Sequence, residues 1–178
     1  NIKELNIQTS DGVDLLAWYS RPKKNQPMLV YFHGNSFDIG ERADRIKRYI
    51  NNGWGVLLLA WRGYSGNLGK PTEKNLYIDG ESTIKWIIDN LNFDYENLII
   101  YGESLGCAVA VELGTRYKFK SIILESPFTS IPDIARKRYK IYPVRNLVLD
   151  KFDNYSKIDK ILSSLLIISG KKDEVIPY

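Results

Sequence analysis

The sequence has 178 residues, of which 44% are hydrophobic and 26% are charged, a composition that fits a globular domain and excludes a chain disordered throughout. Its apolar runs fall well short of the roughly 20 residues that span a bilayer, and the length predicts one domain over residues 1–178. The net charge of +4 is a mild basic excess, so we expect no nucleic-acid partner.

One cysteine and one histidine limit the chemistry of the chain. Cys107 has no partner for a disulfide within the sequence. Together with His33 it cannot build a zinc site from soft ligands, so we expect no metal site and no cofactor. The sequence starts at Asn1 without a methionine or a signal peptide. We therefore expect the native start upstream, with a location in the cytoplasm or at a membrane reached through an upstream segment.

The chain opens with a predicted β-hairpin. Residues 3–9 and 13–19 alternate in character around Ser10-Asp11-Gly12, and Asp-Gly between two such runs is a hairpin signal. Short, uninterrupted apolar runs follow at 28–32, 56–59, 98–101, 122–124 and 165–168. Such runs are too short for buried helices, and their lack of alternation predicts strands that are covered on both faces, as in a parallel sheet.

Helical spacing fills the gaps between these predicted strands. Apolar residues recur every three or four positions between Lys74 and Leu91, and again from Leu105 onward. Strands alternating with helices predict an α/β fold, with a mostly parallel sheet, an antiparallel N-terminal hairpin and helices on both faces. Between these elements, the glycine-rich turn at 63–71 resembles a phosphate-binding loop, but Pro71 stands where that motif needs Ser or Thr. We expect a surface turn that borders the functional site.

The stretch 130–160 is less regular than the rest of the chain. It contains Pro132, Pro143 and the basic run 136–140. We consider two arrangements for it: a lid-like excursion over the site, or two connecting helices packed on the sheet. The basic run could contact anionic lipid headgroups, which would give peripheral membrane contact, or form a solvated helix face.

The segment Gly102-Glu103-Ser104-Leu105-Gly106 has the G-x-S-x-G pattern of a strand-to-helix turn that carries a nucleophilic serine. Glycines two positions before and after the serine avoid side-chain clashes in such a strained turn. A serine at a helix N-terminus also places free amides and the positive end of the helix dipole at a developing oxyanion. We therefore predict Ser104 as the nucleophile; the alternative is a structural turn whose serine only caps the helix.

The segment His33-Gly34-Asn35 follows the predicted strand 28–32, at the position that supplies the other half of an oxyanion hole. The predicted donors are the backbone amides of Asn35 and Leu105. His33 is assigned to the geometry of this loop. The rival role of general base is disfavoured, because His33 precedes the nucleophile and lies on the oxyanion side.

An acid follows the last apolar run, 165–168. Asp173 is well placed just past a buried parallel strand to orient an imidazole, and we predict it as the acid of the triad, with Glu125 as the alternative. No second histidine follows Asp173. We expect a last strand, a histidine-bearing loop and a final helix to be missing from this sequence, which would leave 165–168 as an exposed apolar edge.

These segments together resemble the α/β-hydrolase superfamily, most of all the subgroup that includes membrane-associated lipid hydrolases and protein depalmitoylases. The likeness covers nearly the whole chain and rests on 31–35, 62–64, 102–106, 125–132 and 168–177. The resemblance implies Ser104 as nucleophile, Asp173 as acid and the amides of Asn35 and Leu105 as oxyanion donors. Cys107 is a departure, since a third glycine is usual there.

We predict a hydrolase of carboxylic esters or thioesters that acts through an acyl-enzyme on a small-molecule or lipid acyl substrate. Loss of one triad member costs on the order of 10⁴ to 10⁶ in turnover, so we expect the 178-residue chain by itself to be close to inactive. Two alternatives stay open: an acylaminoacyl- or dipeptidyl-type serine peptidase relative, and a non-catalytic remnant or binding module. The sequence indicates neither the acyl group nor the oligomeric state.

Overall fold

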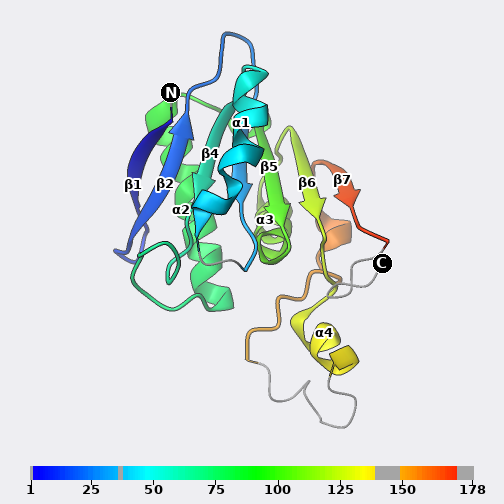
Figure 1. The fold of residues 1–178 in the computed structure, drawn as a ribbon. Coiled ribbons are helices and arrows are strands. Elements are labelled where there is room, and N and C mark those ends of the chain that lie inside the picture. The colour runs from blue at the N-terminus through cyan, green and yellow to red at the C-terminus, as the bar shows by residue number, and fades with distance from the viewer. Residues whose placement is uncertain (1, 36–37, 139–148, 172–178) are drawn as a thin grey trace.

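The computed structural model describes residues 2–35, 38–138 and 149–171. One seven-stranded sheet, in the order β1-β2-β4-β3-β5-β6-β7, forms the centre of the molecule (Figure 1). The strands are β1 Lys3–Gln8, β2 Asp14–Ser20, β3 Met28–Phe32, β4 Gly55–Leu59, β5 Leu98–Glu103, β6 Ser121–Glu125 and β7 Ser164–Ile168. The α-helices are α1 Ala43–Asn51, α2 Glu73–Leu91, α3 Leu105–Arg116 and α4 Ile131–Arg138, and the 3-10 turns are η1 Ile39–Arg42, η2 Tyr95–Asn97 and η3 Ile158–Lys160.

The N-terminal hairpin is confirmed. β1 and β2 pair antiparallel from Lys3 opposite Tyr19 to Gln8 opposite Asp14, and the turn closes with a 2.9 Å hydrogen bond from the Gly12 amide to the Thr9 carbonyl. β2 also runs antiparallel to β4, whereas β4, β3, β5, β6 and β7 run parallel. The fold is therefore the predicted α/β arrangement, a mostly parallel sheet that begins with an antiparallel hairpin.

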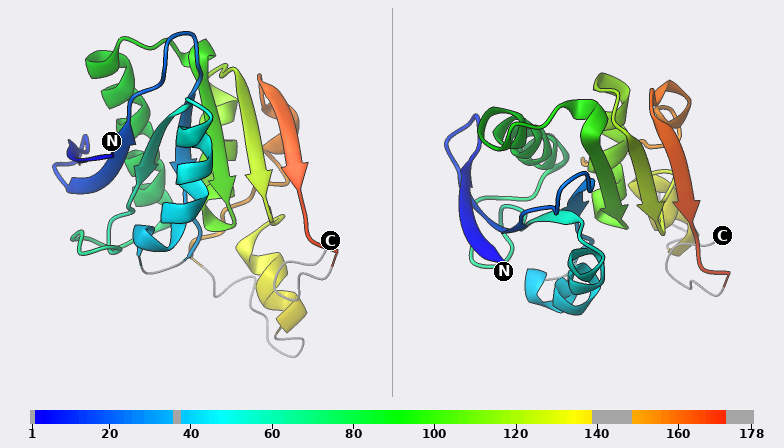
Figure 2. Two further views of the ribbon diagram at one scale, coloured as in Figure 1. Left: turned by 45° about the horizontal axis from the view of Figure 1, so that its top comes forward. Right: turned by 90° about the horizontal axis from the view of Figure 1, so that it is seen from above.

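Helices cover both faces of the sheet (Figure 2). α1 packs through Ile46 on one face, against a cluster that includes Leu29 and Val56. α2 and α3 pack on the other face through residues such as Ile84 and Val109. Sequence spacing does not single out α1, because its nine residues place few apolar side chains between many charged ones. β3 and β4 lie between the two layers and are buried at every position.

β7 differs from the other predicted parallel strands. It lies at one edge of the sheet with β6 as its partner, and all five of its residues are exposed, Leu166 at 53% and Ile167 at 51%. The expectation of cover on both faces is therefore wrong for β7 among the described residues, while the expectation of an exposed apolar edge is confirmed. An uninterrupted apolar run predicts that a strand forms, but it does not say what covers the strand.

The predicted lid region begins with α4, which lies beyond the C-terminal ends of the parallel strands (Figure 1). Residues 139–148 lie outside the described residues, and so do the last two positions of the basic run 136–140. The returning chain binds α2, since the Lys151 and Phe152 amides donate to Glu73 Oε2 at 2.8 and 3.0 Å. The described part of 130–160 holds one α-helix, so two helices packed on the sheet are not found there; the lid role stays a prediction.

A helix that could cross a membrane, by length and apolar character, does not occur within residues 2–35, 38–138 and 149–171.

Candidate active site

Ser104 occupies a sharp turn between β5 and α3. Its backbone angles are φ 48° and ψ −110°, a left-handed conformation that strains any residue with a side chain. Two backbone hydrogen bonds hold the turn: the Ser104 amide donates to the Glu125 carbonyl at 2.8 Å, and the Cys107 amide donates to the Ser104 carbonyl at 2.9 Å. The Ser104 hydroxyl makes no capping bond to α3. The alternative of a serine that only caps the helix is therefore wrong.

The glycines on either side of Ser104 are required by close packing. A Cβ on Gly102 would lie 2.7 Å from the Cys107 Cα, and a Cβ on Gly106 would lie 2.0 Å from the Phe32 carbonyl oxygen. No side chain fits at either distance. The start of α3 is therefore pressed against the end of β3. This contact places the elbow, the strand-to-helix turn at residues 102–106, beside the segment that follows β3.

Gly34 brings that segment into contact with Ser104. A Cβ on Gly34 would lie 3.3 Å from Ser104 Cβ, and Asn35 is the next residue. Leu105 is the first residue of α3, and amides in the first turn of a helix have no acceptor within the helix. The structure thus brings Ser104, Asn35 and Leu105 together at one end of the sheet; their catalytic roles remain predictions.

The glycine-rich turn after β4 borders this site, as the sequence suggested. The Tyr64 hydroxyl donates a short hydrogen bond to Asn35 Oδ1, and the Ile39 amide donates to Ser65 Oγ at 3.1 Å. Burial raises the pKa of Tyr64, which keeps its hydroxyl protonated as a donor. These contacts tie the turn after β4 to both sides of the connection between β3 and α1.

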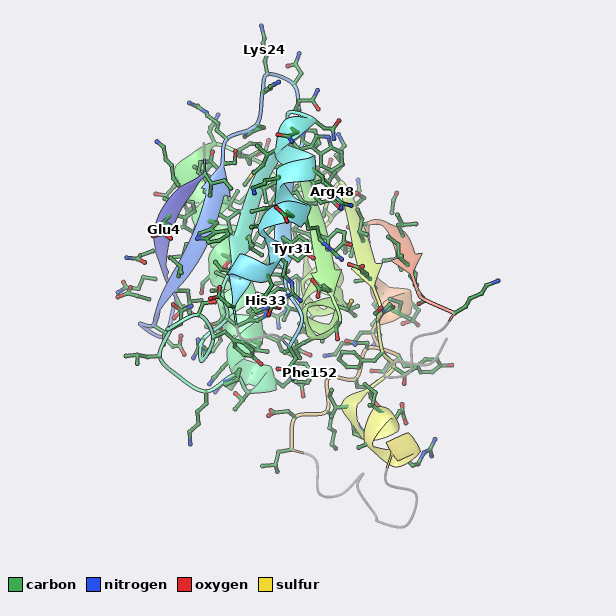
Figure 3. The ribbon with its side chains drawn as sticks, viewed as in Figure 1. Glu4, Lys24, Tyr31, His33, Arg48 and Phe152 are labelled. Carbon is green, nitrogen blue, oxygen red and sulfur yellow. The ribbon has the colours of Figure 1, made fainter. Side chains whose placement is uncertain are left out.

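His33 is completely buried. Its Nδ1 lies 2.7 Å from the Gly34 carbonyl oxygen, to which it donates, and its Nε2 accepts from the Trp61 amide at 3.5 Å. Burial lowers the pKa of His33 to about 4, so the imidazole is neutral at neutral pH. Figure 3 labels His33 toward the lower edge of the sheet, below Tyr31 of β3. Both ring nitrogens are used inside the fold, an arrangement that suits loop geometry and leaves neither available as a base.

The two acid candidates fare differently. Asp173 lies outside the described residues. Glu125 is described, at the end of β6, and its Oε2 accepts from the Tyr101 hydroxyl at 2.6 Å and forms an ion pair with Arg45 of α1. Because that carboxylate oxygen already has two partners on the α1 face, the geometry does not favour Glu125 as the acid that orients an imidazole.

A second carboxylate cluster lies directly beside the nucleophile. The Glu103 cluster consists of Arg42, Glu103 and Tyr31: Arg42 Nε donates to Glu103 Oε2 at 3.1 Å, Arg42 Nη2 binds Glu103 Oε1, and the Tyr31 hydroxyl donates to Oε2 at 2.6 Å. Burial acts to raise the pKa of Glu103, but the hydrogen bonds from Arg42 and Tyr31 outweigh it and the pKa is lowered. Sequence reasoning missed this cluster, because only folding brings Arg42 and Glu103 together.

A third cluster fixes the start of the turn after β4. The Arg62 side chain is 3% exposed; its Nε donates to Asp79 Oδ1 at 2.8 Å and its Nη1 donates to Asp11 Oδ2 at 2.8 Å. Burial raises the pKa of Asp79 although Arg62 opposes the shift, whereas hydrogen bonds from Arg62 lower the pKa of the more exposed Asp11. One guanidinium thus binds two carboxylates, two residues before Tyr64, whose hydroxyl binds Asn35.

Comparison with curated proteins finds relatives that match nearly all of this chain. Alpha/beta hydrolase domain-containing protein 17B of Homo sapiens is 36% identical over 176 residues, which cover 96% of this chain and 59% of that protein. An uncharacterized protein of Mycobacterium tuberculosis is 32% identical over 177 residues, which cover 98% of this chain and 63% of that protein. The chain thus spans about three fifths of the length of these relatives. No protein-family model matches it.

Solved structures share the fold. An esterase of Pyrococcus furiosus superposes with a TM-score of 0.79 at 20% identity, covering 99% of this chain and 74% of its own. An alpha-beta hydrolase of Vibrio vulnificus superposes with a TM-score of 0.80 at 20% identity, covering 94% of this chain and 63% of its own. With the strand order, the strained serine between β5 and α3 and the curated relatives, these likenesses identify the chain as a member of the α/β-hydrolase superfamily.

Proposed function

We propose that Ser104 is the nucleophile of a serine hydrolase that cleaves a carboxylic ester or thioester through an acyl-enzyme. The observation that carries this proposal is the strained φ of 48° at Ser104, on a turn pressed against Gly34. Backbone strain of this kind persists where a fold over-determines it, and it is concentrated at active sites. The names of the curated relatives and of the solved structures support a hydrolase.

In the proposed reaction, the Ser104 hydroxyl attacks the acyl carbon while a general base takes its proton. The carbonyl oxygen becomes an oxyanion that accepts hydrogen bonds from the amides of Asn35 and Leu105, and one such donor contributes roughly 10² to 10³ to kcat. The intermediate collapses and releases an alcohol or a thiol. Water then attacks the acyl-enzyme, releases the carboxylic acid and regenerates Ser104. Asp173 would orient the base.

The base is the part that these residues do not supply. His33 is the only histidine in the sequence, and both its nitrogens are used within the fold. We therefore expect the turnover rate of the 178-residue chain by itself to lie below that of an enzyme with a complete triad, by a factor on the order of 10⁴ to 10⁶. An imidazole supplied from outside the sequence should restore part of the rate.

This expectation gives an assay that uses the chain as it is. The release of nitrophenol from a short-chain and a long-chain nitrophenyl ester is followed with and without free imidazole in the buffer, beside a matched thioester and anilide. Ser104→Ala measures the hydrolysis by imidazole alone. We expect imidazole to raise the rate of the wild-type chain above that of Ser104→Ala. Equal rates for the two proteins on every substrate would overturn the proposal.

The same assay separates the alternatives. A preference for the long-chain ester would favour a lipid acyl substrate over a small one. Faster cleavage of the anilide than of the ester would favour the peptidase alternative, because amides need protonation of a poorer leaving group. Binding of the esters without any Ser104-dependent turnover would favour a binding module.

A further inference from the structure

The Glu103 carboxylate touches both sides of the connection between β3 and α1. On one side, a Cβ on Gly34 would lie 3.2 Å from Glu103 Oε1, so this oxygen packs directly against the Gly34 backbone. On the other side, Arg42 at the end of η1 binds both oxygens of the same carboxylate. One side chain thus contacts the residue before Asn35 and the residue before α1.

The contact with Arg42 is of the kind that fixes geometry. The Arg42 and Glu103 side chains are only 13% and 18% exposed, and the guanidinium uses two nitrogens on two carboxylate oxygens. Bidentate pairs of this type are stronger and more directional than a single hydrogen bond, and lysine cannot reproduce them. The Tyr31 hydroxyl of the central strand β3 completes the cluster at 2.6 Å (Tyr31 is labelled in Figure 3).

Glu103 is also joined to the nucleophile through the backbone. It is the last residue of β5 and directly precedes Ser104, and in the sheet it lies opposite Glu125, whose carbonyl accepts from the Ser104 amide. The main chain of Glu103 is therefore part of the elbow, while its side chain contacts Gly34 and Arg42 on either side of Asn35 in the connection between β3 and α1.

We propose that Glu103, held by Arg42, is a positioning residue that sets the separation between the Asn35 amide and the Ser104 hydroxyl, and so the width of the oxyanion hole. This inference rests on the proposed hydrolase function. An oxyanion hole contributes only when its donors meet the position of the developing charge, since donors that must move lose most of their effect. The Glu103 carboxylate packs against Gly34 and binds Arg42, and Glu103 directly precedes Ser104. It is therefore suited to hold the Asn35 amide and the Ser104 hydroxyl at a fixed separation.

The test replaces Glu103 with a neutral residue of the same shape. Glu103→Gln keeps the packing against Gly34 but removes the charge that holds the guanidinium. We expect kcat for the imidazole-assisted reaction to fall about tenfold, which is less than the loss of kcat when one oxyanion donor is removed. KM should stay within about twofold of wild type. In parallel, amide hydrogen exchange of Gly34 and Asn35 should become faster, because the segment loses its anchor.

Glu112→Gln is the matched control. The Glu112 side chain is 14% exposed and binds two cations, Arg116 and Lys157, but it lies further along α3, away from Gly34. Its loss should lower stability to a similar degree while leaving kcat and the exchange of Gly34 and Asn35 unchanged. Arg42→Lys is the second variant to use if Glu103→Gln does not fold, and it should show the same loss of kcat.

The two readouts separate this inference from the proposed function. A wild-type chain no faster than Ser104→Ala would end the hydrolase proposal, and the exchange of Gly34 and Asn35 would still decide whether Glu103 holds the segment. Unchanged exchange in Glu103→Gln would overturn the inference whatever the activity. A wild-type kcat in Glu103→Gln, or a matching loss in Glu112→Gln, would overturn it as well. Faster exchange together with a lower kcat in Glu103→Gln alone would support it.

Discussion

Gly106 lies so close to Phe32 that a Cβ on this glycine would stand 2.0 Å from the Phe32 carbonyl oxygen. The first turn of α3 therefore rests on the backbone of β3 at the point where that strand ends. This contact joins the turn that carries Ser104 to the segment that carries Asn35.

Gly106→Ala should be among the most damaging single-methyl changes in the chain. Overpacking typically costs 1–3 kcal/mol, and here the obstacle is backbone, so we expect a loss of about 3 kcal/mol or more in the free energy of unfolding. Gly66→Asn is the control: Gly66 has φ +84° but nothing within 4 Å of its Cβ position, and Asn tolerates that conformation. Urea unfolding should show a large loss for the first variant and a small one for the second; equal midpoints would contradict the packing described.

Ser104 should show a conflict between stability and function. Its φ of 48° and ψ of −110° strain a residue with a Cβ by about 1–3 kcal/mol, and Ser104→Gly relieves the strain at about 0.5–1 kcal/mol of extra chain entropy. We expect Ser104→Gly to be more stable than Ser104→Ala by about 1 kcal/mol, while neither variant reacts at position 104. Thermal unfolding of the two variants measures the difference, and a less stable glycine variant would mean that the turn is unstrained.

His33 should make the stability of the protein depend on pH. Because burial lowers its pKa from 6.5 to about 4, the unfolded chain binds a proton below pH 6.5 while the folded chain stays neutral until about pH 4. The contribution of the neutral imidazole is thus complete above pH 6.5 and is lost progressively as the pH falls to about 4, on the order of 3 kcal/mol in all.

The single histidine makes this measurement direct. NMR titration should give one imidazole, with its midpoint near pH 4 and not 6.5. In His33→Asn, the slope of unfolding free energy against pH between 6.5 and 4 should be smaller than in wild type, whatever the absolute stability of the variant. A normal midpoint would show that the ring is exposed or paired with a carboxylate.

The Arg62 cluster predicts unequal effects for two similar substitutions. Asp79 is completely buried whereas the Asp11 side chain is 36% exposed. Both Asp79 oxygens accept from Arg62. Burial already favours a neutral Asp79, but Asp79→Asn turns one of these oxygens into an amide donor that faces an Arg62 N–H inside the core, and should cost about 3 kcal/mol. Asp11→Asn should cost about 1 kcal/mol or less. Denaturant unfolding compares the two. A larger effect at Asp11 would mean that the exposed carboxylate carries most of the attraction.

The sequence predicted the parts of this fold that depend on local pattern. The hairpin around Gly12 and the strands β3 to β7 follow from short-range polarity, and the elbow follows from the spacing of Gly102, Ser104 and Gly106. Each of these features is determined by residues a few positions apart, so a single sequence is enough to reveal it.

The features it missed depend on contacts between distant segments. Arg42 and Glu103 are 61 positions apart, and Arg62 and Asp79 are 17 apart, so nothing in local spacing pairs them. The apolar pattern of 165–168 resembles that of the buried strands β3 and β4, so by itself it predicts burial. The exposure of β7 was predicted only from the expected fold, in which a further strand would pair with it. α1 was not predicted, because charged residues outnumber apolar ones along this short helix and Ile46 is its buried residue.

Substitutions at Asn35 can distinguish the role of its backbone amide from that of its side chain. Asn35→Ala removes the bond from Tyr64 but keeps the backbone N–H, whereas Asn35→Pro removes both. If the amide is an oxyanion donor, the proline variant should lose roughly 10² more in kcat than the alanine variant in the imidazole-assisted ester assay. Equal rates would exclude the Asn35 amide from the oxyanion hole.

The most direct test of the central claim is to locate the adduct formed by a fluorophosphonate probe. The chain is incubated with the probe in the presence of imidazole, digested, and analysed by mass spectrometry. We predict a single phosphonylated peptide with the modification on Ser104, and no adduct in Ser104→Ala. An adduct on another residue, or equal labelling of Ser104→Ala, would contradict a nucleophile at the turn between β5 and α3.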